Sequence, residues 1–86
     1  MQFVRNPKAE IRKVGEGAAV YIPGERSLHV LNTTAQLIFE YLEEPADVGE
    51  LTLMLTEVTG ADEQVIRPDL EEVLNELVGI GLITPG

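Results

Sequence analysis

The stretch LHVLNTTAQLIFEYLEEP, residues 28–45, contains the point at which the chain changes from a strand-forming to a helix-forming pattern. Val30 and Leu31, just before the change, are residue types that pleated sheets favour. After Asn32, apolar residues recur at i, i+3, i+4 and i+7, one face of a helix: Ala35, Ile38, Phe39 and Leu42. Asn32 can cap this helix, and Pro45 ends it. The pattern predicts a strand that leads directly into a helix.

Two further strands are predicted before this one. Short runs over Ala9–Val14, Ala18–Ile22 and Ser27–Leu31 are separated by turn residues at 15–17 and 23–26. The runs contain β-branched, aromatic and large apolar residues: Val14, Val20, Tyr21, Ile22, Val30 and Leu31. Because both turns are short, the simplest arrangement is a meander of three antiparallel strands.

A second helix is predicted after Pro45. Asp47 followed by Glu50 is a capping-box pattern, and Gly60 suits the left-handed conformation that often ends a helix. Between them runs one apolar face: Val48, Leu51, Leu55 and Val58.

The third helical segment opens near Asp62 and contains a proline. Its apolar stripe consists of Ile66, Leu70, Val73, Leu74 and Leu77. Pro68 would cost about 3 kcal/mol inside a helix but little at the first helical position. We therefore expect a short turn over Asp62–Ile66, then a break or kink, then the main helix from about Pro68. Leu82 and Ile83 are expected to fold back onto the core.

These elements describe a single α+β domain over residues 1–86. We expect a winged-helix-like fold, in which an N-terminal three-stranded antiparallel sheet is followed by a three-helix bundle. The sequence has no cysteine, so a disulfide framework or thiolate metal site is impossible. No apolar run approaches the length of a membrane span. We therefore expect a soluble, cytoplasmic protein with no membrane partner.

Charge is distributed unevenly along the chain. Five Lys or Arg against three Glu give residues 1–31 a net charge of +2. Arg67 alone against twelve carboxylates gives residues 32–86 a net charge of −11. In a winged helix the last helix would be the one that contacts DNA, yet here it is acidic and would repel phosphates. We therefore expect no nucleic-acid partner.

The residues that usually carry catalysis are isolated. His29, the only histidine, has no ligand cluster around it and is more simply a half-exposed strand residue. Ser27, the only serine, has no positioned base and does not occur at a helix start, as the serine of a carrier protein does. Gly15-Glu16-Gly17 lacks the lysine of a phosphate loop. We expect a binding module and no enzyme, with no catalytic residue, metal or cofactor.

The order of several short motifs resembles one known family. His29-Val30-Leu31-Asn32, followed by Thr34-Ala35 and Leu37-Ile38-Phe39, is similar to the start of the first helix in PqqD-like proteins, the RiPP recognition elements. The resemblance continues through Asp47–Leu55 and returns at Asp69-Leu70, Val73-Leu74, Leu77 and Gly81-Leu82-Ile83. It covers about residues 10–83. Pro68 departs from the family pattern, and the loop 23–26 lacks the Gly-x-Tyr-Tyr run of many lasso-peptide relatives.

The resemblance implies a function and a site. In this family the leader segment of a ribosomally made precursor peptide adds as an antiparallel strand to the third strand, in a groove against the third helix. A peptide-modifying enzyme, often a radical SAM enzyme or a leader peptidase, then acts on the core peptide. The implied edge is Ser27, Leu28, His29, Val30 and Leu31; the implied groove wall is Ile66, Leu70, Val73 and Leu74, with Arg67 and Asp69 at the rim.

Two interpretations of the residues remain open. Large apolar side chains are more often core residues than ligand contacts, and this holds for Leu28, Val30, Leu70, Val73, Leu74 and Leu77. The domain could also be a winged-helix-like protein–protein interaction module that binds no precursor peptide. Strand addition by a short synthetic peptide distinguishes the leader-binding domain from the interaction module. The peptide would pair with the unpaired N–H and C=O groups that an edge strand presents.

Overall fold

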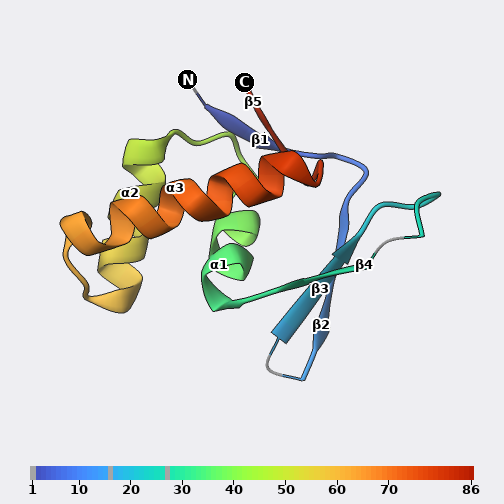
Figure 1. Cartoon of the computed structure of the whole chain (residues 1–86), viewed down its shortest axis with the longest axis horizontal. Helices are drawn as coiled ribbons and strands as arrows, with labels where there is room; N and C mark the ends of the chain where they lie inside the picture. Colours follow the sequence, from blue (N-terminus) through green and yellow to red (C-terminus); the bar gives the residue numbers. More distant parts are fainter. Residues whose placement is uncertain (1, 16, 27) are drawn as a thin grey trace.

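The computed structural model describes residues 2–15, 17–26 and 28–86. A three-stranded sheet and three helices follow one another, and two short strands flank them near the chain ends (Figure 1). In chain order the elements are β1 (Phe3–Arg5), β2 (Glu10–Val14), β3 (Gly17–Tyr21), β4 (Leu28–Leu31), α1 (Thr33–Tyr41), α2 (Val48–Thr59), α3 (Glu63–Gly79) and β5 (Ile83–Pro85). The expected α+β class, with a sheet followed by helices, is confirmed.

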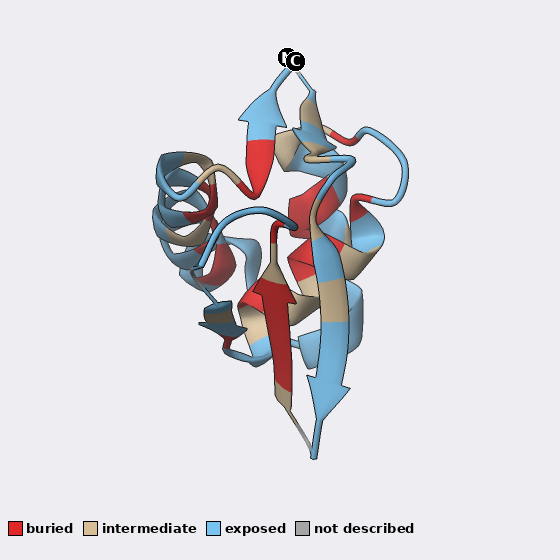
Figure 2. Cartoon of the chain, turned by 90° about the vertical axis from the view of Figure 1, so that its right-hand side faces the viewer, coloured by how far each residue is buried: buried red, intermediate tan, exposed pale blue. Residues whose placement is uncertain are grey.

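The main sheet is an antiparallel meander in the order β2-β3-β4. β3 lies in the centre and is buried along most of its length, whereas the other strands are more exposed (Figure 2). Side chains alternate between the two faces of the sheet. Val20, paired with His29, faces the helices, and Ala19, paired with Val30, faces away from them. Because β3 is central, β2 and β4 are the two edge strands of this sheet.

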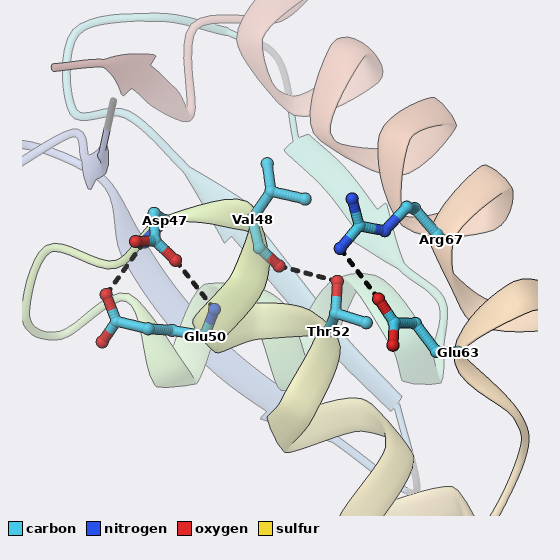
Figure 3. A network of polar contacts seen from close by, with 6 residues as sticks. All are labelled: Asp47, Val48, Glu50, Thr52, Glu63 and Arg67. Atoms are coloured by element: carbon cyan, nitrogen blue, oxygen red, sulfur yellow. Dashed lines mark hydrogen bonds and ion pairs between the residues drawn. The ribbon is translucent and has the colours of Figure 1, made fainter.

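Local capping explains where α1 and α2 begin. The Asn32 side chain accepts a 2.8 Å hydrogen bond from the Ala35 amide. Asp47 and Glu50 form a reciprocal capping box, with the Glu50 amide donating to Asp47 and the Asp47 amide donating to Glu50 (Figure 3). Gly60 ends α2 in the left-handed conformation, with φ of 73°. Each of these caps satisfies backbone groups that a helix end leaves unpaired, and each was predicted.

The expected break at Pro68 is wrong, because α3 runs continuously from Glu63 to Gly79 with Pro68 inside it. The missing amide costs one helical hydrogen bond. Against that cost, the helix buries Ile66, Leu70, Leu74 and Leu77 on both sides of the proline. Burial of one such side chain contributes roughly 1.5–3 kcal/mol. Packing therefore outweighs the local penalty.

A two-stranded sheet joins the ends of the chain, and no pattern in the residues predicts it. β1 pairs antiparallel with β5, with Val4 opposite Thr84 (Figure 1). The amide of Phe3 also donates to the carbonyl of Ala46 at 2.7 Å. Leu82 and Ile83 are fully buried, as expected of residues folded back on the core. The result is a closed core between the main sheet and the three helices.

Candidate functional site

The outer edge of β4 pairs with no other strand within residues 2–15, 17–26 and 28–86, and the register indicates which backbone groups this free edge offers to a partner. Val14 pairs with Gly17 at the end of the β2–β3 ladder, and only two residues lie between them in the sequence. Strands joined by a two-residue connection end in a hydrogen-bonded pair. Hydrogen-bonded and non-bonded pairs alternate along an antiparallel ladder. Counting across the sheet, β4 bonds to β3 through His29 and Leu31, and the N–H and C=O groups of Leu28 and Val30 face the free edge.

The side chains of β4 divide in the same alternating way. Leu28 and Val30 lie on the outer face of the sheet, where they are 61% and 80% exposed. His29 is half-buried and Leu31 is buried, on the face toward the helices. Ser27, which was expected to begin this edge, lies outside the described residues. The strand thus has a free edge, one exposed apolar face and one face packed inward.

A cleft of about 240 Å³ opens where β4 gives way to α1 and lies between that point and α3. Asn32 and Thr34 line one side, and the α3 side is lined by Asp69, Glu72, Val73 and Glu76. The α3 residues follow a spacing of three, four and seven, so they form one stripe along the helix. Three of them are carboxylates, and no basic residue is among the described residues that line the cleft.

A second cleft of about 180 Å³ continues past the start of α1. It shares Thr34 and Asp69 with the first cleft, so the two are contiguous. Its other lining residues are mostly apolar and come from the end of α2 and the start of α3: Leu55, Thr59, Ala61, Val65 and Ile66. Together the clefts form a groove, which we call the α3 groove, with an acidic compartment next to β4 and an apolar compartment beyond it.

The structure separates the expected groove residues. Asp69 and Val73 line the acidic compartment and Ile66 lines the apolar one. Leu70 and Leu74, expected as groove walls, are 0% and 3% exposed and line neither cleft. They pack in the core beneath the groove, so their contribution is to hold α3 in position.

Arg67 also lies away from the groove. Residues i and i+2 of an α-helix are about 200° apart around its axis, so Arg67 and Asp69 cannot line the same side of α3. Arg67 instead forms an ion pair with Glu63 at 2.9 Å, one turn earlier on α3 (Figure 3). The expectation of Arg67 as a rim contact is therefore not supported by its placement.

Several residues of the α3 groove were not anticipated from the sequence. Glu76 and Val65 extend the stripe of Asp69 and Val73 in both directions, so the helical period could have identified them. Thr34 and the α2 residues carry no such signal, because their approach to α3 depends on how the helices pack. Asn32 caps α1, as predicted, and it also lines the cleft, which the sequence does not indicate.

The remaining features of the surface do not add chemistry to this groove. A larger cavity of about 640 Å³ lies at the junction of α1 and α2, where its lining includes Glu40, Glu43, Glu44 and Glu50. Within residues 2–15, 17–26 and 28–86 no three acidic, histidine or cysteine side chains are grouped to hold a metal ion. In the same part of the chain, no helix combines the length and apolarity needed to cross a membrane.

A three-stranded sheet whose β4 edge lies beside a helical groove defines this chain as a small α+β domain of the winged-helix-like class. The chain belongs to the PqqD family, since the family model described as coenzyme PQQ synthesis protein D (PqqD) matches residues 17–83. No curated protein matches it in sequence.

Two solved structures share its fold. TbiB1 in complex with the TbiA(beta) leader peptide aligns with a TM-score of 0.82 at 14% identity, over 96% of each chain. Lasso peptide synthetase B1 complexed with the leader peptide aligns with a TM-score of 0.81 at 19% identity, over 99% of this chain and 100% of that one.

Proposed function

We propose that this domain binds the leader segment of a ribosomally synthesised precursor peptide and presents it to a peptide-modifying enzyme. The leader adds as an antiparallel strand to the free edge of β4 and lies along the α3 groove. The observation that carries the proposal is the free edge of β4, which ends at a groove against α3 in a PqqD-family fold. Two proteins with this fold were solved as complexes with leader peptides, which supports the same role here.

Strand addition uses backbone groups of β4 that do not pair with β3. Leu28 and Val30 direct N–H and C=O groups to the edge, and any extended peptide can pair with them whatever its side chains. Selectivity must then come from the groove, where side chains of the peptide meet α3. The division suits a chaperone-like role, because the leader is held while the distant core peptide stays free for chemistry.

The domain acts as a binding module and not as an enzyme: His29 is half-buried on an edge strand and no other histidine, and no cysteine, exists to assist it. Binding of the leader takes place in the cytoplasm, where a ribosomally made precursor first becomes available. The partner enzyme is of the radical SAM or leader-peptidase type, as the family resemblance implies.

Presentation is tested with the gene neighbourhood and a reconstituted reaction. We expect a short precursor reading frame and a modifying enzyme beside the gene. We expect removal of this domain to lower turnover of the full precursor about tenfold or more, because an enzyme that does not hold the leader itself loses the effective concentration that tethering provides. Turnover is followed by mass spectrometry of the core peptide.

The control substrate is the core peptide without its leader, whose slow turnover should not respond to added domain. Equal turnover of the full precursor with and without the domain would contradict presentation. It would favour the alternative of an interaction module that binds no precursor.

A further inference from the structure

The two compartments of the α3 groove have different chemistry, and this difference bears on which peptide the groove accepts. The acidic compartment has Asp69, Glu72 and Glu76 on its α3 side. These carboxylates are exposed, and none of them makes a described ion pair. Arg67, the one basic residue of the helical half, lies on the other side of α3 and pairs with Glu63.

The apolar compartment lies further along the same groove. Leu55, Ala61 and Val65 contribute apolar surface there, and Val65 is 61% exposed. Thr34 and Asp69 border both compartments, so a peptide leaving the acidic one enters the apolar one directly. An exposed apolar surface that continues a binding groove is suited to an apolar side chain of the same ligand.

The direction of the peptide follows from the sheet. The main sheet is antiparallel throughout, so a strand added to β4 extends that pattern by running antiparallel to it. The N-terminal end of such a strand lies at the C-terminal end of β4, beside Asn32, where the acidic compartment opens. Residues further toward the N-terminus of the peptide then reach the apolar compartment.

The number of peptide residues between the two compartments follows from the α3 residues that line each compartment. The apolar compartment is centred near residues 66–67 of α3 and the acidic one near residues 72–73. About six residues of helix rise roughly 9 Å, which an extended peptide covers in about three residues.

We propose, on the basis of the proposed leader-binding function, that the leader carries a lysine or arginine for the acidic compartment. A large apolar residue precedes it by about three positions and occupies the apolar compartment, and the strand that pairs with β4 follows. The groove therefore selects leaders by an apolar-x-x-basic pattern at the N-terminal side of the added strand. Opposite charge across the groove favours such a leader and disfavours an acidic one.

The test uses a library of random twelve-residue peptides, displayed and selected on the intact domain. We expect enrichment of Lys or Arg, with a large apolar residue about three positions before it, by about threefold or more over the input library. Selection on a variant with Asp69→Asn, Glu72→Gln and Glu76→Gln should abolish the basic preference and keep the apolar one. Selection on Val65→Asn should do the reverse. All four changed side chains are exposed, so the variants should fold.

One selected peptide then gives the quantitative check. Changing its basic residue to Gln should weaken binding to the parent domain about threefold to fivefold, and should have no effect on the triple variant. Raising the salt concentration should reduce the difference, because these charges are exposed.

A control variant separates this inference from the function on which it rests. Val30→Pro removes a free-edge donor and leaves the groove intact. Peptides that lose binding to Val30→Pro but show no basic preference would overturn the two-compartment inference while supporting strand addition. Peptides that bind Val30→Pro as well as the parent would overturn strand addition itself.

Discussion

Replacing Val30 by proline should weaken leader binding about tenfold or more while changing the free energy of unfolding by less than about 1 kcal/mol. Val30 directs its amide to the free edge of the sheet, so proline removes a donor that the leader uses and none that β3 uses. One hydrogen bond contributes about 0.5–1.5 kcal/mol, and the pyrrolidine ring adds a steric obstacle to the incoming strand. Calorimetric titration with a synthetic leader and denaturant unfolding measure the two effects.

Two matched variants control for the presence of proline and for the loss of the side chain. Lys13→Pro places the same ring on β2, the other edge of the sheet, and should leave leader affinity unchanged. Val30→Ala keeps the amide and removes most of an exposed side chain, so affinity should fall less than about threefold. Equal losses for Val30→Pro and Lys13→Pro would show that the effect does not come from the β4 edge.

Replacing Leu70 by alanine should lower the free energy of unfolding by about 2–5 kcal/mol, because this fully buried side chain leaves a cavity beneath the groove. Small domains have only about 5–15 kcal/mol in total, so the loss is large. The folded fraction should bind the leader within about threefold of the parent affinity. Denaturant unfolding and titration under strongly native conditions measure these quantities.

Val73→Ala is the contrasting variant, because Val73 is half-buried and lines the acidic compartment. We expect a loss of affinity of roughly fivefold, about 1 kcal/mol, with a smaller loss of stability than Leu70→Ala. If Leu70→Ala does not fold, Leu70→Ile replaces it in the test. This change alters the shape of the side chain at nearly constant volume and lowers the free energy of unfolding by less than about 1.5 kcal/mol. Weak binding by a stable Leu70→Ile variant would show that Leu70 contacts the peptide directly.

The features that could be predicted from the sequence are those governed by neighbours in the chain. Asn32 and the Asp47–Glu50 pair act within one helical turn, so their capping roles are visible in the residue order alone. The three strands of the main sheet are linked by short turns, which makes their antiparallel order nearly unavoidable.

The features that were missed depend on contacts between distant segments. β1 and β5 are three residues long and pair across almost the whole chain, so no local pattern indicates them. The local cost of Pro68 predicts a break in α3, but that cost does not include the core contacts that α3 makes on either side of the proline. Leu70 and Val73 belong to one apolar stripe, and only the packing of α3 shows that the first is core and the second lines the groove.

Residue-resolved hydrogen exchange, measured by NMR with and without a bound leader, tests strand addition to β4 most directly. The amides of Leu28 and Val30 face the free edge, so we predict that both gain strong protection when the leader pairs with them. The amides of His29 and Leu31 already pair with β3 and should change less. Protection that appears only on β2 or α2, with Leu28 and Val30 unchanged, would contradict strand addition to β4.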